Sequence, residues 1–402
     1  MYFCEDSISD LAGKIRLAVG SYLDAATTLR TQSNPMLSKL IAATALCQAA
    51  ASPAELPVTQ LQAIDRYVAS EMARQQIPGL TLGVYRHGHA VLLKGYGLAN
   101  IEHDVPATPD TVMQSGSIGK TFTATLVMML VEQGRLRLDD SIRSHVAGLP
   151  ETWQAITIGQ LLSHTSGIAD YDGDELTGRD GPFDVRRDFT EAELVQKVSQ
   201  LPVEASPGET WSYRNANYLL LGAVIRSITG KFHGDILAED IFGRLGMTAS
   251  RVISDQEIVP HRAAGYERRE GTLYNQAWVS PTFNSTADGT LYLTVRDLEH
   301  WDRALCSASV LAPATLAQMW TPYPVDGVVP EGGYGLGWFV RNHPSGPIVE
   351  HDGAWQGFTS YFGRYLGTGV SVAVFTNLHA DHSRPDQIGQ GVAGLVDARL
   401  VD

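Results

Sequence analysis

The residues of this sequence best suited to chemistry are Ser117 and Lys120, which lie three positions apart in Ser117-Ile118-Gly119-Lys120. A serine hydroxyl is a poor nucleophile until a base takes its proton, and a lysine at i+3 of a helix lies on the same face, within reach of that oxygen. Lys120 can act as this base when its amine is neutral near pH 7, a state that burial favours. The pair therefore predicts acyl transfer through a covalent intermediate on Ser117.

The Ser-x-x-Lys spacing alone is weak evidence, because roughly one match is expected by chance in a chain of this length. Its context is more informative. Ser117 follows the turn-like stretch Gln114-Ser115-Gly116 and opens an apolar segment that reaches Glu132. The Ser117 hydroxyl and amide N–H would then lie at the positive N-terminus of a helix, a setting that stabilises a developing oxyanion.

Two later stretches, Tyr213-Arg214-Asn215 and His351-Asp352-Gly353, add side chains that could complete such a site. A tyrosine held beside Lys120 could share the role of base or protonate the leaving group, and an amide such as Asn215 could hold both the lysine and a substrate carbonyl. A core aromatic and a helix cap are the simpler interpretations of Tyr213 and Asn215. His351-Asp352-Gly353 is predicted to end a strand, before a loop rich in glycine and aromatic residues.

Other chemistries are less well supported by the sequence. The stretch Ser115–Gly119 lacks the first glycine of a Gly-x-Ser-x-Gly nucleophile elbow, which argues against an α/β-hydrolase. His164 and Ser166 follow a predicted helix and are interpreted as a structural turn at the edge of the cleft. His379 and His382 are interpreted as part of a solvated loop, so no metal site is predicted.

The elements that must position these residues form two groups along the chain. Period-two and helical patterns predict an early helix and hairpin, a buried central helix, several helical segments, and then late strands with a last helix. The predicted ranges are 58–76, 80–85, 90–96, 117–132, 158–164, 191–200, 218–229, 335–341, 348–351, 358–365, 370–377 and 386–400.

These ranges predict an α+β fold, in which helices flank an antiparallel β-sheet assembled from both ends of the chain. An α/β part would comprise about 58–137 and 280–402, and an inserted all-α region would comprise about 138–279. A cleft between these two parts is the expected place for a site.

The N-terminal stretch has the order of parts found in a secretory signal peptide. Met36-Leu37-Ser38-Lys39 is a short basic start, an apolar segment runs from Leu40 to Leu46, and Ala49-Ala50-Ala51 offers a cleavage site. We expect residues 36–51 to be this signal, residues 1–35 to be an upstream extension outside the fold, and residues 58–402 to form the hydrolase domain. The protein would then be exported, to the periplasm or outside the cell.

The amino-acid composition limits the classes of partner that the protein can bind. The chain of 402 residues is 44% hydrophobic and has a formal net charge of −14, with no run of Lys or Arg. This argues against a protein that binds nucleic acid or anionic lipid through a basic surface, and the apolar stretch near residue 40 is too short to span a membrane. A small-molecule or peptide substrate is the expected partner, and the oligomeric state is not encoded in any pattern we recognise.

Taken together and in this order, the three motifs resemble those of the serine β-lactamase and penicillin-binding D,D-peptidase superfamily, in its class C-like branch. The resemblance covers the chain from about Leu61 to the C-terminus. The residues that carry it are Ser117-x-x-Lys120, Tyr213-x-Asn215 and His351-x-Gly353.

The resemblance implies a role for each matching residue. Ser117 would be the acylated nucleophile, Lys120 and Tyr213 the proton-transfer pair, and Asn215 a residue that positions substrate. The backbone N–H groups of Ser117 and Ala354 would form the oxyanion hole, beside a third motif in which His351 and Gly353 contact substrate. An acyl-enzyme would form and be hydrolysed without a metal or organic cofactor.

The third motif departs from the family pattern, because most β-lactamases have Lys-Thr-Gly where this chain has His351-Asp352-Gly353. The fixed cation that helps to bind a substrate carboxylate is missing, and a histidine is charged only part of the time at neutral pH. Asp352 would repel a carboxylate if it faced the site, although strand alternation puts it on the face opposite His351 and Gly353.

We therefore expect a D,D-peptidase, D-aminopeptidase or esterase with weak β-lactam turnover. The alternatives are a class C-like β-lactamase and a catalytically weak penicillin-binding or scaffold protein.

Overall fold

A computed structural model of the chain describes residues 55–325 and 331–401. The predicted upstream extension (1–35) and signal peptide (36–51) lie outside the described residues. No described helix combines the length and the apolar character that crossing a membrane requires.

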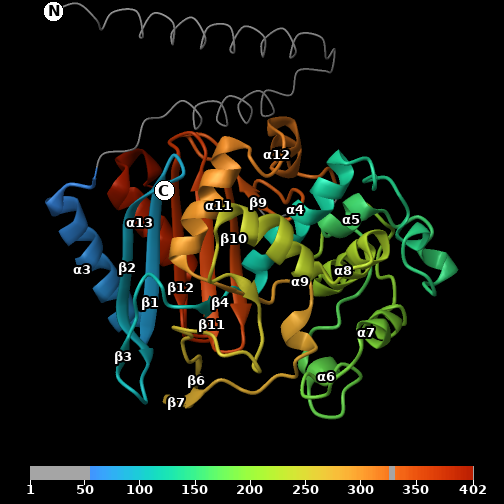
Figure 1. The fold of residues 1–402 in the computed structure, drawn as a ribbon, viewed down its shortest axis with the longest axis horizontal. Helices are drawn as coiled ribbons and strands as arrows, with labels where there is room; N and C mark the ends of the chain where they lie inside the picture. Colours follow the sequence, from blue (N-terminus) through green and yellow to red (C-terminus); the bar gives the residue numbers. More distant parts are fainter. Residues whose placement is uncertain (1–54, 326–330, 402) are drawn as a thin grey trace, which may run out of the picture. The chain divides into compact units, whose positions relative to one another are not determined.

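The centre of the fold is a seven-stranded antiparallel sheet with the strand order β3-β2-β1-β12-β11-β10-β9 (Figure 1). Its first three strands come from the start of the domain and its last four from the end, and the two groups join where β1 pairs with β12, as in Leu80 opposite Thr376. The prediction of one sheet built from both ends of the chain is confirmed. The strands are β1 (Gly79–Arg86), β2 (His89–Asn100), β3 (Val105–Pro106), β9 (Phe339–Arg341), β10 (Ile348–Trp355), β11 (Phe358–Tyr365) and β12 (Val370–Thr376).

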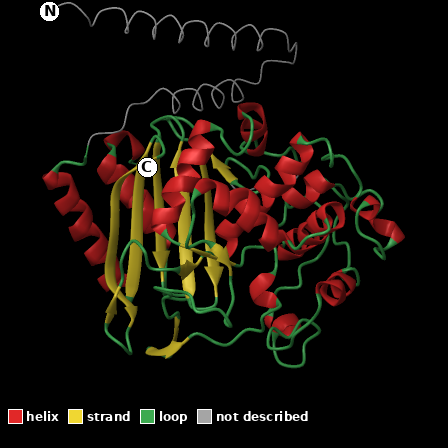
Figure 2. Ribbon diagram, viewed as in Figure 1, coloured by secondary structure: helices red, strands yellow, loops and turns green. Residues whose placement is uncertain are grey.

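Helices cover both faces of this sheet, and further helices lie beside it (Figures 1 and 2). Helices α3 and α13 pack together on one face, and α11 contacts β1, β2 and β12 from the other. Strands β1 and β12, at the centre of the sheet, are therefore buried along almost their whole length, which explains their continuous apolar sequences. The helices are α3 (Val58–Gln75), α4 (Gly119–Glu132), α5 (Ile158–Leu162), α6 (Asp174–Thr177), α7 (Glu191–Val198), α8 (Asn215–Thr229), α9 (His233–Ile236), α10 (Gly243–Leu245), α11 (Val295–Ser307), α12 (Pro313–Met319) and α13 (Pro385–Val396).

Helix α4 is the predicted central helix, and it is buried on nearly every side. Its Phe122 ring stacks on Trp301 of α11 at 4.2 Å between centroids and meets Phe242 edge-on at 5.7 Å. The α-helix begins at Gly119 rather than at Ser117, because Gly116–Ile118 form a 3₁₀ turn that precedes it. This core fixes the helix that carries the predicted nucleophile and base.

Three further differences from the predicted layout bear on the inserted region and on the site. The region 138–279 is helical at first but ends in short strands, β5 (Arg251–Val252) and the hairpin of β6 (Tyr266–Arg269) and β7 (Thr272–Asn275). Strand β9 begins at Phe339 rather than at residue 335. Strand β10 continues to Trp355, so His351-Asp352-Gly353 lies inside a strand, because the chain reverses in a two-residue turn, Gln356-Gly357, with Gln356 at φ 46°. The remaining short strands are β4 (Met113–Gln114) and β8 (Leu291–Leu293), and β8 pairs with β4 on one side and with β5 on the other.

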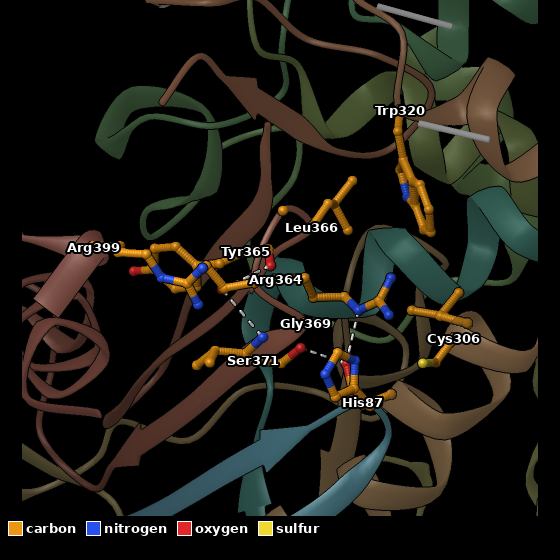
Figure 3. A pocket seen from close by; sticks show the side chains of 14 residues that line it. His87, Cys306, Trp320, Arg364, Tyr365, Leu366, Gly369, Ser371 and Arg399 are labelled. Carbon is orange, nitrogen blue, oxygen red and sulfur yellow. Dashed lines mark hydrogen bonds and ion pairs between the residues drawn. The ribbon is translucent and has the colours of Figure 1, made fainter. Parts of the chain in front are cut away.

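A small cavity of about 240 Å³ lies between α11 and the ends of β11 and β12, and it contains none of the predicted site residues (Figure 3). Arg364 crosses it, with its guanidinium 5.1 Å from the Trp320 ring and its Nε 2.7 Å from Oδ1 of Asp302. Both charged groups are almost fully buried. The ion pair joins β11 to α11 and is structural.

Candidate active site

Ser117 lies in the 3₁₀ turn at the entrance to α4, beside strand β10 of the sheet. Gly116 has φ 50°, and a Cβ atom at this position would lie 2.4 Å from the Ala354 nitrogen, so only glycine fits the turn. The Ser360 hydroxyl donates to the Ser115 carbonyl at 2.6 Å and ties the same turn to β11. The turn thus holds Ser117 against the sheet edge at the N-terminus of a buried helix.

Lys120 is fully buried one turn below Ser117, with three oxygens around its Nζ atom. Nζ lies 3.0 Å from Ser117 Oγ and 2.8 Å from Asn215 Oδ1, and it also donates to the Asp288 carbonyl. A neutral amine has two N–H groups and one lone pair. Because the amide and carbonyl oxygens can only accept, they take the two N–H groups, and the lone pair is left pointing at the Ser117 hydroxyl.

The environment brings the pKa of Lys120 into a useful range. Desolvation lowers it from 10.5 to about 8, although the charges of Asp288, Asp170, Asp352 and Asp172 act in the opposite direction. About a tenth of the amine is then neutral at pH 7. Lys120 can therefore serve as the general base that the sequence predicted.

Tyr213 places its ring 4.9 Å from Lys120 Nζ. Burial raises its pKa well above 10, and the nearby Ser117 hydroxyl is the largest influence in the other direction. Tyr213 is therefore a neutral phenol at neutral pH, suited to donating a proton rather than to acting as a phenolate base. Of the two roles predicted for it, a neutral phenol is better suited to protonation of the leaving group.

Asn215 is the first residue of α8, and an aspartate that the sequence analysis missed holds it in place. The two carboxylate oxygens of Asp170 accept the backbone N–H groups of Asn215, at 2.8 Å, and Ala216, at 3.0 Å. These N–H groups have no partner within their own helix, so a carboxylate at the helix N-terminus satisfies them. Asp170 thereby aims the Asn215 amide at Lys120.

The predicted oxyanion hole lies where β10 meets the nucleophile turn. Strand β9 pairs with β10 only at Ile348–Glu350. On that edge of β10, the later residues therefore face the turn that carries Ser117 instead of a strand. A Cβ atom at Gly353 would lie 2.1 Å from the Ser115 carbonyl oxygen and 2.9 Å from the Ser117 nitrogen. The absence of a side chain at Gly353 therefore allows the backbones of Ser117 and Ala354 to come together.

The structure places His351 away from the substrate cleft. Its side chain is 1% exposed, its Nε2 lies 3.1 Å from the Tyr334 hydroxyl and its Nδ1 lies 2.6 Å from the Asp352 carbonyl oxygen. Because a carbonyl only accepts, the proton belongs on Nδ1, and Nε2 accepts from Tyr334. Desolvation lowers the pKa of His351 to about 3. The ring is thus neutral at pH 7 and supports the wall of the cleft. This differs from the prediction, in which a partly protonated His351 contacts substrate.

The side chain of Asp352 projects from the face of β10 opposite to that of His351. The predicted alternation is correct, but it is Asp352 whose side chain lines the cleft, and that side chain is 69% exposed. The prediction that the alternation weakens its repulsion of a substrate carboxylate is therefore wrong. Alternation assigns side chains to the two faces of a strand, whereas the packing around β10 decides which side chain reaches the cleft.

His164 forms the structural turn that the sequence predicted. It has φ 60°, and its Nδ1 accepts the backbone N–H of Arg214 at 3.2 Å. Its ring lies 4.3 Å from that of Tyr213, while Ser166 donates to Asn217 at 2.7 Å. The turn therefore supports the extended segment that carries Tyr213, and its own side chains serve as structural contacts.

These residues meet in a cleft of about 810 Å³. Ser117, Tyr213, Asn215, Gly353 and Ala354 line it, and Lys120 lies beneath its floor. No group of three or more metal-ligating side chains is present among the described residues. Asp170, Tyr171 and Asp288 are among the further lining residues that the sequence analysis missed.

Comparison with known proteins agrees with this geometry. The Beta-lactamase family model matches residues 64–393. Protein flp of Staphylococcus aureus (strain N315) is 28% identical over 333 residues, which are 80% of this chain and 64% of that protein. The chain thus spans less than two thirds of the length of this relative.

Two solved structures are similar throughout the domain. The octameric penicillin-binding protein homologue from Pyrococcus abyssi has a TM-score of 0.74 and 28% identity, over 83% of this chain and 77% of that one. The D-amino acid amidase from Ochrobactrum anthropi SV3, solved with L-phenylalanine amide, has a TM-score of 0.70 and 26% identity, over 85% of this chain and 97% of that one. The chain belongs to the β-lactamase family, within the serine hydrolase superfamily that also contains the penicillin-binding proteins.

Proposed function

We propose that this protein hydrolyses a peptide amide or an ester through an acyl-enzyme on Ser117, as a D,D-peptidase, D-aminopeptidase or esterase, and that it turns over β-lactams weakly. The observation that carries the proposal is the hydrogen-bond set of Lys120. Its Nζ contacts Ser117 Oγ at 3.0 Å, and two fixed oxygens take its other N–H groups. This arrangement supports a base ready to receive the serine proton.

The proposed reaction returns every group to its starting state. Neutral Lys120 takes the Ser117 proton while Oγ bonds to the substrate carbonyl carbon, and the N–H groups of Ser117 and Ala354 stabilise the oxyanion. The bond to the leaving amine or alcohol then breaks, and that group receives a proton through Tyr213. Water next adds to the acyl carbon and gives its proton to Lys120. The Oγ–acyl bond breaks, the acid is released and Ser117 regains its proton.

Weak β-lactam turnover follows from the charges at the third motif. Penicillins carry a carboxylate, and the residue that would supply a cation, His351, is neutral and buried in this chain. Asp352, an anion, lines the cleft instead. The similarity to a D-amino acid amidase supports amide or peptide substrates on independent grounds.

Covalent labelling with a fluorescent fluorophosphonate tests the nucleophile. Wild type should label, Ser117→Ala should not, and Ser199→Ala, which removes a hydroxyl at the end of α7, should label like wild type. An inert wild-type protein, or label that persists in Ser117→Ala, would refute the assignment. Labelling without turnover of any substrate would favour a penicillin-binding or scaffold protein.

A substrate panel then tests the reaction type. We expect p-nitrophenyl esters, D-amino acid amides or D-Ala-D-Ala peptides to react faster than nitrocefin, each measured against Ser117→Ala as the blank. Nitrocefin hydrolysis at the rate of an efficient class C β-lactamase would overturn the proposal in favour of that enzyme type.

A further inference from the structure

Asp352 holds a position in the cleft from which it can select substrate by charge. It lies two residues before Ala354 on β10 and on the same face of the strand, and both residues line the cleft together with Ser117. Two residues of a strand span about 7 Å. A substrate group a few bonds from the carbonyl held at Ala354 would therefore lie beside the Asp352 carboxylate.

A nearby cation, Arg384, is already paired with another carboxylate. Its Nε and Nη2 lie 3.0 and 2.6 Å from the carboxylate oxygens of Asp386, and the pKa of Arg384 is raised mainly by Asp386 and in smaller part by Asp352. Among the described residues, the basic side-chain nitrogen found within 4.0 Å of the Asp352 carboxylate is Nδ1 of His351, and this ring is neutral. Among the described residues, no Lys or Arg therefore forms an ion pair with Asp352, although its charge interacts at longer range with those of Lys120 and Arg384.

Other carboxylates lie around the cleft, and Lys120 is the cation beneath its floor. Desolvation, followed by Asp386 and Glu350, raises the pKa of Asp352, whereas its own backbone hydrogen bond and then Lys120 lower it. Asp170, Asp172 and Asp288 also line the cleft. Arg214, the one arginine among the described residues that line the cleft, binds Glu204 at 2.5 Å. These carboxylates favour a substrate that carries a positive charge.

We propose, on the basis of the proposed hydrolase function, that Asp352 is a specificity-determining residue that selects acyl donors carrying a protonated amine near the scissile carbonyl and rejects those carrying a carboxylate there. The apolar residues Val185, Val279 and Phe283 line the same cleft and can hold the uncharged part of such a substrate. Specificity then arises from attraction of one charge and repulsion of the other.

Three anilides that differ mainly in charge provide the test. D-Alanine p-nitroanilide carries an ammonium, its N-acetyl derivative is neutral and its N-succinyl derivative carries a carboxylate. We expect wild type to prefer the first to the third in kcat/KM. A unit charge about 5 Å away in a dielectric of 40 to 80 changes a rate by roughly four- to fifteenfold. The preference should shrink at high salt, because salt screens exposed charges.

Asp352→Asn removes the charge and keeps the shape of the side chain. We expect its ratio of kcat/KM for the amine over the carboxylate substrate to fall by at least about fourfold, and Asp352→Lys to reverse the preference. Asp139→Asn is the matched control, since Asp139 is also 69% exposed, lies outside the cleft and loses the same charge. The neutral anilide reports whether each variant is folded and competent.

The outcomes separate the two proposals. A ratio that Asp352→Asn leaves unchanged, in an enzyme whose turnover depends on Ser117, overturns the role of Asp352 and leaves the hydrolase proposal intact. A wild type that neither cleaves any anilide nor reacts with fluorophosphonate overturns the hydrolase proposal itself. If a variant loses turnover, the rate of Ser117 acylation by a fluorescent penicillin gives the second readout. This rate should rise in Asp352→Asn, and an unchanged or lower rate contradicts the inference.

Discussion

Asp288→Asn tests how the charges around Lys120 set the strength of the base. Asp288 heads the charges that raise the pKa of Lys120, and burial is the larger and opposing cause. Its carboxylate accepts from the Tyr171 hydroxyl and from Thr286 Oγ1, and its backbone carbonyl accepts from Lys120. An asparagine can keep both side-chain hydrogen bonds, because the two hydroxyls can each donate or accept. The substitution therefore changes charge with little change in shape.

The size of the effect follows from Coulomb's law. A unit charge about 7 Å from the ammonium, in an effective dielectric of about 30, contributes about 1.5 kcal/mol, or about one pH unit. Removing an anion destabilises the protonated amine, so the pKa of Lys120 falls. Activity should rise with pH through about 8 in wild type, where the base becomes neutral. In Asp288→Asn this rise should be centred near pH 7, and kcat/KM at pH 7 should increase about fivefold.

The assay is the pH dependence of kcat/KM for a neutral p-nitrophenyl ester, measured between pH 5.5 and 9.5 at constant ionic strength. Asp139→Asn, a charge change at an exposed site outside the cleft, should keep the wild-type profile. A wild-type profile without an ascending limb between pH 7 and 9 would refute Lys120 as the base. A limb that Asp288→Asn moves to higher pH would refute the electrostatic account.

Three further substitutions test other parts of the structure. Asn215→Ala removes an oxygen that orients Lys120, and we expect kcat/KM to fall about 10- to 100-fold with the fold retained by circular dichroism. Gly353→Ala places a methyl 2.1 Å from a carbonyl oxygen, which should cost about 1–3 kcal/mol in denaturant unfolding and abolish turnover. Asp302→Asn leaves Arg364 buried without its anion, which should cost about 3–5 kcal/mol. Unchanged activity in the first variant, or unchanged stability in either of the others, would contradict the corresponding contact.

The sheet and the central helix could be predicted because their patterns are local. The apolar sequences of β1 and β12 reflect burial on both faces, and α4 is apolar on nearly every side because it crosses the core. The end of β10 was harder to predict. Its extension through Asp352 to Trp355 depends on a two-residue turn with Gln356 at positive φ, and glutamine is not a residue type that signals such a turn.

The candidate site residues Ser117, Lys120, Tyr213 and Asn215, which the structure brings together, could be found by motif and spacing, whereas the carboxylates around them could not. Asp170 acts on Asn215, 45 residues away, and the Asp288 carbonyl accepts from Lys120, 168 residues away. A single aspartate outside a motif has no spacing that indicates such a contact. The role of His351 also depended on tertiary structure, since burial is the main cause that lowers its pKa to about 3.

The two proposals together lead to one more measurable consequence. The charge of Asp352 is among those that raise the pKa of Lys120. A substrate ammonium paired with Asp352 would cancel that charge, so binding of the substrate would itself lower the pKa of the base. The pH dependence of kcat reports groups in the enzyme–substrate complex, and that of kcat/KM reports the free enzyme.

For D-alanine p-nitroanilide, the ascending limb of kcat should therefore lie at lower pH than that of kcat/KM. The N-acetyl derivative, which brings no positive charge, should lack this displacement, and so should Asp352→Asn with either substrate. The D-alanine ammonium must stay protonated over the pH range used, and its own titration, measured in the absence of enzyme, sets the upper limit of that range. Equal displacement for the charged and neutral anilides would show that substrate binding acts on Lys120 through desolvation rather than through Asp352.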